Sequence, residues 1–102
     1  MSDDELDDET EDDVPEVVEI PLEERIDLHG FLPRDVPQIV RDYLDDAFAA
    51  GFTEVRLIHG RGIAVLRETV RTLLSRDARV ATFRDARPEE GGQGATVAVF
   101  KR

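Results

Sequence analysis

Two segments of this chain repeat one local pattern, in which a short run with apolar residues leads through a His-Gly turn into a helical pattern. The first run, Arg25 to His29, closes on His29-Gly30, and the second, Glu54 to Ile58, is followed by His59-Gly60-Arg61-Gly62. These turns use the only two histidines of the 102 residues. A strand, a turn and a helix in succession, found twice, predict βα units whose strands are parallel.

Alternation in the first run predicts which side chains reach the core. Ile26 and Leu28 lie on one face of the strand, and Asp27 and His29 lie on the other. Right-handed crossovers place both helices on the same face of the sheet, so the apolar pair must face the helices. We therefore expect Asp27 and His29 on the open face, near the carboxyl edge where open α/β sheets bind ligands.

The rest of the folded part supplies two helices and two more strands. Helical periodicity begins after Asp35, a predicted N-cap with Pro37 in the first turn, and stops at Gly51. The other predicted elements are a helix from Val65 to about Ser75 and strands from Val80 to about Asp85 and from Ala95 to Phe100. The order β-α-β-α-β-β predicts an α/β (α+β) two-layer sandwich with a mixed four-stranded sheet, in which the last strand is antiparallel.

Charge divides the chain in two. Residues 1–24 hold 13 of the 24 acidic side chains and no basic one, whereas residues 25–102 hold all 13 Lys and Arg. We expect residues 1–23 to form an acidic disordered tail and residues 24–102 to form the one folded domain. Such a tail could cover a cationic site in cis, dock on basic ribosomal proteins, or only keep the chain in solution.

Composition excludes several classes of protein. There is no cysteine, which excludes disulfides and thiolate metal sites. No apolar stretch approaches membrane-spanning length, and the N-terminus lacks the basic and apolar regions of a signal peptide. We expect a cytoplasmic monomer with no membrane partner.

Glycine-rich turns are expected to gather at the carboxyl edge. If the third strand is parallel to the first two, its loop brings Gly91-Gly92-Gln93-Gly94 there as well. Glycine lets the backbone approach a ligand closely, a helix N-terminus favours an anion, and arginine adds charge-assisted hydrogen bonds. The residues predicted to contact nucleic acid or phosphate are Gly30, Gly60, Arg61, Gly62, Arg67, Gly92 and Gly94.

Histidine beside a carboxylate is suited to phosphodiester cleavage. Its imidazole titrates near neutral pH and can take or give a proton, while an aspartate orients it or stabilises its charge. The predicted catalytic residues are therefore Asp27, His29 and His59. RNA carries its own nucleophile in the 2′-hydroxyl, so no metal or other cofactor is required. A divalent ion such as Mg²⁺ on the two histidines and the aspartate is the second alternative.

These motifs resemble the Smr (small MutS-related) domain family over roughly Arg25 to Arg102. The segments that carry the resemblance are Ile26-Asp27-Leu28-His29-Gly30, His59-Gly60-Arg61-Gly62 with Val65-Leu66-Arg67, and Gly91-Gly92-Gln93-Gly94-Ala95-Thr96. The resemblance implies a fold like the C-terminal domain of translation initiation factor three. It also implies an endonuclease that nicks DNA or cleaves messenger RNA on collided ribosomes, with Asp27 and His29 in the catalytic Asp-x-His motif.

We therefore expect an enzyme, an Smr-domain endonuclease acting on RNA or DNA, with the ribosome as a further partner. RNA is favoured because the chain lacks a mismatch-binding module and a histidine-led site suits the 2′-hydroxyl. The alternative is a non-catalytic module that binds nucleic acid or the ribosome. Its open sheet face would carry Asp27, His29, Arg56, Thr82 and Arg84.

Overall fold

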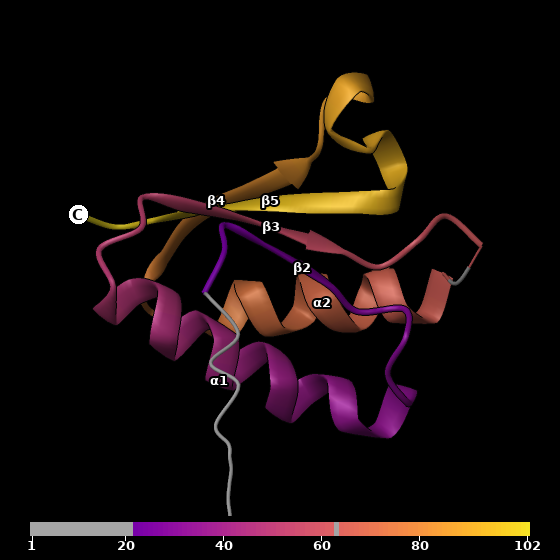
Figure 1. The fold of residues 1–102 in the computed structure, drawn as a ribbon, viewed down its shortest axis with the longest axis horizontal. Coiled ribbons are helices and arrows are strands. Elements are labelled where there is room, and N and C mark those ends of the chain that lie inside the picture. Colours follow the sequence, from indigo (N-terminus) through magenta and orange to yellow (C-terminus); the bar gives the residue numbers. More distant parts are fainter. Residues whose placement is uncertain (1–21, 63) are drawn as a thin grey trace, which may run out of the picture.

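A four-stranded sheet with two helices on one face makes up the fold, in a computed structural model that describes residues 22–62 and 64–102 (Figure 1). The helices and strands in chain order are β2 (Arg25–Asp27), α1 (Val36–Ala49), β3 (Glu54–Ile58), α2 (Ala64–Arg76), β4 (Val80–Asp85) and β5 (Ala95–Phe100). Short 3-10 turns occupy Pro33–Asp35, Pro88–Glu90 and Gly92–Gly94. The predicted order and the two-layer architecture are confirmed.

The sheet is mixed, with the strand order β2-β3-β5-β4. β2 pairs with β3 in parallel, and β5 runs antiparallel to both of its neighbours, β3 and β4. Three strands therefore point the same way, and their carboxyl ends reach one edge of the sheet. The loop from β4 to β5 rises from that edge on the side opposite the helices (Figure 1), which we call the open face.

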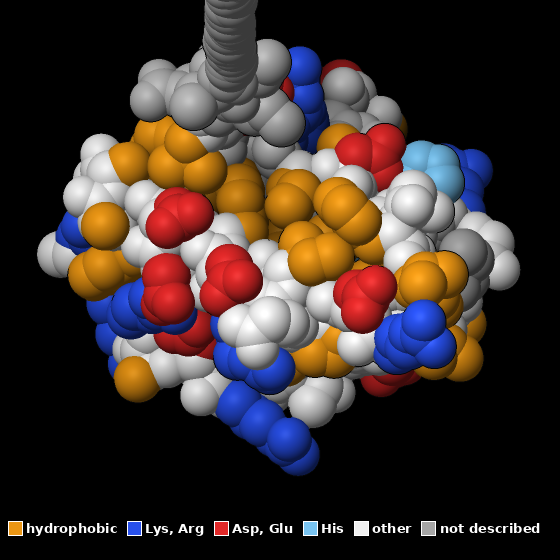
Figure 2. Space-filling view, turned by 60° about the horizontal axis from the view of Figure 1, so that its bottom comes forward, with side chains coloured by type: hydrophobic (Ala, Val, Ile, Leu, Met, Phe, Trp, Pro, Cys, Tyr) orange, Lys and Arg blue, Asp and Glu red, His pale blue; other side chains and the backbone are white. Residues whose placement is uncertain are grey.

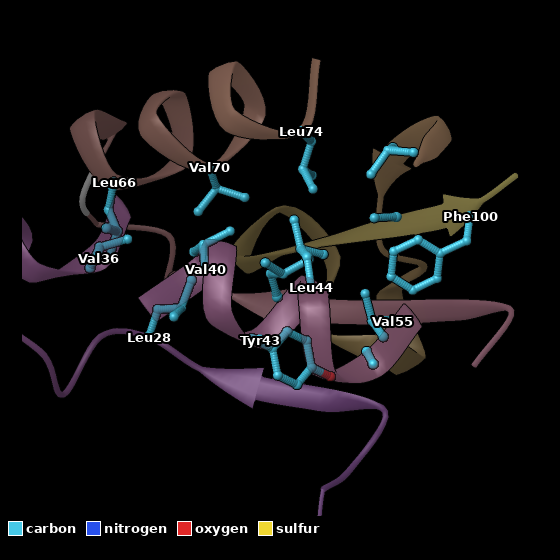
Figure 3. Close-up of a cluster of buried hydrophobic side chains, with 14 residues drawn as sticks. Leu28, Val36, Val40, Tyr43, Leu44, Val55, Leu66, Val70, Leu74 and Phe100 are labelled. Atoms are coloured by element: carbon cyan, nitrogen blue, oxygen red, sulfur yellow. The ribbon is translucent and has the colours of Figure 1, made fainter. Parts of the chain in front are cut away.

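The hydrophobic core lies between the helices and the sheet (Figure 3). Its helical members recur every three or four residues, as expected for helices with one apolar face. They are Val36, Val40, Tyr43, Leu44 and Ala47 in α1 and Leu66, Val70 and Leu74 in α2. Leu28 and Val55 meet them from the sheet (Figure 3). Each fully buried aliphatic side chain contributes about 1.5–3 kcal/mol, so this layer holds the strands in place.

The C-terminal end of α1 agrees with the prediction from the sequence, whereas the predicted N-cap hydrogen bond is not made. Gly51 ends the helix as predicted, because its φ of 90° lets its N–H reach Phe48 O at 3.1 Å while Phe52 N reaches Ala47 O at 3.1 Å. Asp35 occupies the N-cap position, but its side chain makes no capping hydrogen bond. The preceding 3-10 turn runs straight into the helix and gives Asp35 a helical backbone (φ −89°, ψ −17°), so its carboxylate is not placed as a cap.

β2 is shorter than the predicted run to His29. The Asp27 carboxylate accepts a hydrogen bond from His29 N at 3.2 Å, which turns the chain after Asp27. One more ladder bond follows, from Leu28 N to Ile58 O at 2.7 Å. The regular strand thus ends at Asp27, and the turn that follows brings the side chains of Asp27 and His29 together.

The helical side of the molecule is not cationic. Figure 2 shows both acidic and basic side chains scattered over this side among hydrophobic ones. In α1, Asp42, Asp45 and Asp46 outnumber Arg41. In α2, Arg67, Arg71 and Arg76 outnumber Glu68, so acidic and basic side chains balance over the two helices.

The predicted tail, residues 1–23, lies outside the described residues except for Leu22 and Glu23.

Within residues 22–62 and 64–102, neither helix combines the length and the apolar character needed to span a bilayer.

Candidate active site

Three turns meet at the carboxyl edge of the sheet. His59 N and Gly60 N both donate to Gly94 O, at 2.9 and 2.8 Å, which ties the second turn to the third. A Cβ placed on Gly60 would lie 4.0 Å from the Cβ of His29, so the first turn adjoins the second. The turns at residues 29–30, 59–62 and 91–94 therefore form one small surface.

Asp27 and His29 form an exposed pair on this surface. His29 Nδ1 lies 2.5 Å from Asp27 Oδ1, and the two side chains are 56% and 57% exposed. Asp27 stands opposite Ile58 in the register and shares the open face with it. The carboxylate engages Nδ1, so Nε2 is the imidazole nitrogen left to a ligand.

His59 has the opposite environment, because its side chain is completely buried. Nδ1 lies 3.0 Å from Gly60 O and Nε2 lies 2.9 Å from Thr96 Oγ1. A carbonyl only accepts, so Nδ1–H donates to it and Nε2 accepts from the Thr96 hydroxyl. Burial lowers the pKa of His59, and the neighbouring Arg67 lowers it further.

The predicted proton-transfer role of His59 stays a prediction, and this position leaves the ring no free nitrogen. The neutral ring has both nitrogens occupied inside the protein and none directed at solvent. Its contacts instead join the second turn to β5, through Thr96. Within the site, His59 is therefore a positioning residue for the Gly60 turn.

Arg67 is also engaged inside the protein. Its Nη2 lies 2.8 Å from Asp85 Oδ1, and Arg71 Nη1 lies 3.1 Å from the same oxygen. Arg67 lowers the pKa of Asp85, chiefly through this hydrogen bond. The predicted phosphate contact by Arg67 stays a prediction, and in this structure its charge ties α2 to the end of β4.

Arg61 is the cation that the turns leave on the surface. It is exposed, and its side chain runs along the third turn. A Cβ on Gly92 would meet Arg61 Nη2 at 3.4 Å, and one on Gly94 would meet Arg61 Cγ at 3.5 Å. These contacts place a guanidinium within the same surface as the Asp27–His29 pair.

The predicted glycines divide by conformation. Gly60 and Gly92 have φ of 84° and 57°, values that side chains disfavour. Gly30 and Gly62 are exposed, and a Cβ on either would meet nothing within 4 Å. Gly94 is buried beneath Arg61. Open backbone for a ligand is thus offered at Gly30 and Gly62.

The open face continues the site away from the edge. Arg25 pairs in register with Arg56, and both Arg56 and Arg84 stand opposite Val97 on β5. Arginines from three strands therefore lie in one row across the sheet. Arg56 and Arg84 are two of the residues predicted for this face.

The alternative of a divalent ion on the two histidines and the aspartate stays a prediction. No group of three or more His, Asp or Glu side chains in the described part of the chain is arranged to hold an ion. Both ring nitrogens of His59 are engaged in hydrogen bonds inside the protein, so neither is free to bind an ion. Asp27 and His29 alone would give an ion two protein ligands.

Sequence comparison relates the chain to known proteins. The model of the Smr domain matches residues 26–101. Endonuclease MutS2 of Aquifex aeolicus is 40% identical over 83 residues, which cover 78% of this chain and 11% of that protein. Endonuclease MutS2 of Caldicellulosiruptor bescii is 45% identical over 76 residues, which cover 74% and 10%. The match thus spans about a tenth of the length of these relatives.

Solved structures give the same relation. The crystal structure of the Smr domain of Thermus thermophilus MutS2 has a TM-score of 0.72 and 40% identity, over 76% of this chain and 98% of that chain. YdaL, a stand-alone small MutS-related protein from Escherichia coli, has a TM-score of 0.67 over 76% of this chain and 64% of that chain. Its 24% identity supports the fold alone.

Proposed function

Because this chain belongs to the Smr domain family, we propose that it is an endonuclease that cleaves phosphodiester bonds of single-stranded RNA. The observation that carries the proposal is the exposed Asp27–His29 pair, with Nδ1 and Oδ1 2.5 Å apart, at an edge shared by three glycine turns. The relatives named endonuclease MutS2 support the reaction class. The RNA substrate is our own choice, made on the chemistry of the pair.

The geometry suggests a role for each group. Asp27 holds Nδ1 of His29 and fixes the ring, so Nε2 can take the proton of a 2′-hydroxyl. The 2′ oxygen then attacks the adjacent phosphorus, the bond to the 5′ oxygen breaks, and that oxygen takes a proton from solvent. A 2′,3′-cyclic phosphate and a 5′-hydroxyl result. No metal is needed for these steps.

Arg61 and the free backbone of the turns would stabilise the charge that develops on the phosphate. A guanidinium suits the phosphate oxygens geometrically, and preorganised donors act most strongly on the transition state. Arg61 is exposed beside Gly92 and Gly94. His59 contributes indirectly, because it holds the turn that presents Arg61.

The first test is cleavage of a labelled single-stranded RNA and of a DNA duplex, each with EDTA and with magnesium. We expect RNA cleavage that survives EDTA and leaves cyclic phosphate ends. His29→Ala should slow it by about 100- to 10,000-fold. Asp27→Asn should slow it as well, and Asp42→Asn, on the exposed helical side, is the matched control for that variant.

Other outcomes would redirect the proposal. Magnesium-dependent DNA nicking that His29→Ala abolishes would replace RNA by DNA as the substrate. Binding of RNA without cleavage of either nucleic acid would favour the non-catalytic module. Cleavage unchanged in His29→Ala would remove the Asp27–His29 pair from the mechanism.

A further inference from the structure

A pocket of about 160 Å³ lies on the open face of the sheet, along β2 from Asp27. Arg25, Arg56, Glu90 and Val97 are among its lining residues. Arg25 precedes Asp27 by two residues on the same strand and faces the same way, a separation of about 7 Å along the strand. A ligand in the pocket therefore lies on the same face of β2 as Asp27.

Arg56 enters the pocket with unused hydrogen-bonding capacity. Among the described residues it has no ion-pair partner, and its Nε lacks a hydrogen-bond acceptor. The neighbouring Arg25 faces Glu23 only loosely, at 3.8 Å and with both side chains 59% exposed. Nε itself is buried, so the Nη groups of Arg56, which have no partner among the described residues, are the donors available to an acceptor on a ligand.

Glu90 brings the opposite hydrogen-bonding character. One of its oxygens accepts from Arg87 N at 3.0 Å and faces Arg84 at 3.6 Å. The Arg87 N–H is the chief cause that lowers the pKa of Glu90, so the group is an ionised acceptor at neutral pH. Its second oxygen can receive a hydrogen bond from a ligand.

This combination of charges disfavours a phosphate and suits a neutral base. Glu24 and Glu54 also line the pocket, so its acidic side chains outnumber its arginines. A phosphate would satisfy only the arginines, whereas a planar ligand with acceptors on one edge and donors on another satisfies both kinds of group. Guanine has this pattern, because arginine binds its O6 and N7, while a carboxylate accepts from its N1–H and amino group. Val97 supplies an apolar surface for the ring.

We propose that this pocket, the base pocket, binds the guanine of a nucleotide adjacent to the bond that is cleaved. The inference rests on the proposed endonuclease function, to which it adds a base preference. Arg56 donates to the guanine and Glu90 accepts from it. Asp27 and His29 lie outside the base pocket and read no base.

The test measures binding separately from cleavage. The cleavage-deficient variant Asp27→Asn/His29→Ala is titrated with fluorescent oligoadenylates that contain one guanine, one inosine or none, and anisotropy is recorded. We expect about tenfold tighter binding of the guanine RNA than of the all-adenine RNA. Inosine lacks the amino group and should give an intermediate affinity.

Two arginine variants, made in the same background, separate base recognition from general attraction. Arg56→Gln should abolish the guanine preference, so that the guanine and all-adenine RNAs bind with about equal affinity. Arg61→Gln, the matched control, should weaken binding of all the RNAs while the tenfold preference remains. Thermal unfolding of each variant confirms that it is folded. Equal binding of the guanine and adenine RNAs, or a preference retained in Arg56→Gln, overturns the proposal.

The two proposals fail in distinguishable ways. If the wild-type protein cleaves RNA but neither binds nor cuts with a guanine preference, the base pocket is wrong and the endonuclease stands. If a preference that depends on Arg56 is found without any cleavage, the endonuclease is wrong and the base pocket stands only as a guanine-binding site.

Discussion

At the scale of single residues, the two histidines occupy opposite environments although both follow a strand and precede a glycine. His29 is exposed and held by a carboxylate, while His59 is buried and holds a carbonyl and a hydroxyl. The first arrangement leaves a nitrogen for proton transfer, and the second fixes a turn. Substitutions should therefore separate activity from stability.

Asp27→Asn should abolish most of the activity at little cost in stability. An amide in place of the carboxylate no longer favours the tautomer with the proton on Nδ1, so we expect a loss of about 100- to 10,000-fold in RNA cleavage. The pair is more than half exposed, so the free energy of unfolding should fall by less than about 1 kcal/mol. Single-turnover cleavage and urea unfolding measure the two effects. A large loss of stability would contradict the assignment.

His59 should make the stability of the protein depend on pH. Its pKa in the folded protein lies below the ordinary 6.5, so the unfolded chain binds the proton first as the pH falls. The contribution of His59 to the free energy of unfolding is therefore complete above about pH 6.5 and decreases below it, by at most about 1.4 kcal/mol per pH unit. Urea unfolding between pH 7.5 and 5 should show this slope in the wild type and in His29→Gln.

The contrast is His59→Gln, which cannot titrate. It should be less stable at pH 7.5, because the contact with Thr96 changes, but should lack the slope between pH 6.5 and 5. Asp85 has a lowered pKa and titrates at more acidic pH, so it does not account for the slope. An unchanged slope in His59→Gln would contradict the buried position.

Much of the candidate site could be predicted at this scale. Alternation from Arg25 onward was enough to place Asp27 and His29 on the open face. The same rule applied to Val55, Leu57 and His59 gives all three the same face, so the burial of His59 was available in the sequence. The pairing of Arg67 with Asp85 was not, because it joins residues 18 positions apart in different elements.

At the scale of elements, the turns and their glycines were more predictable than the strand order. Glycine after an apolar run gives a turn from local chemistry alone. The place of β5 between β3 and β4 depends on tertiary pairing, which no local pattern specifies. Likewise, the 3-10 turns that bring Glu90 to the open face were predicted only as a loop.

Two glycines with positive φ at opposite ends of the sheet allow a matched test. Gly51 (φ 90°) lies between α1 and β3, and Gly91 (φ 117°) lies in the loop that carries Glu90. Alanine at either position should cost about 1–2 kcal/mol of stability, because side chains disfavour this backbone. Only Gly91→Ala should also reduce RNA cleavage, since it disturbs the third turn. If both variants cleave RNA at the same rate, the loop that contains Gly91 has no role in cleavage.

At the scale of the whole molecule, charge is distributed very unevenly. Residues 1–20 carry 11 acidic side chains and no basic one, which equals the entire net charge of −11. The arginine row on the open face belongs to an otherwise neutral body. A polyanionic ligand therefore meets a repulsive potential from the N-terminal segment and an attractive one from the sheet.

Deletion of residues 1–20 should strengthen RNA binding at low salt. We expect about a tenfold lower Kd at 20 mM salt and no difference at 0.5 M, where the Debye length falls to a few ångströms. A chain of full length with the acidic residues of this segment changed to Asn and Gln is the control for length. Equal affinities of all three proteins at low salt would leave the segment without an electrostatic role.

The position of the last residue has a practical consequence. Arg102 donates to Phe52 O and Phe48 O at 2.8 and 2.6 Å, beyond the carboxyl end of α1 and at the far edge of the sheet from the three turns (Figure 1). A linker joined after Arg102 would anchor the protein to a glass slide with the edge that holds the three turns facing the liquid. The proposed binding and cleavage of single RNA molecules could then be watched at that edge.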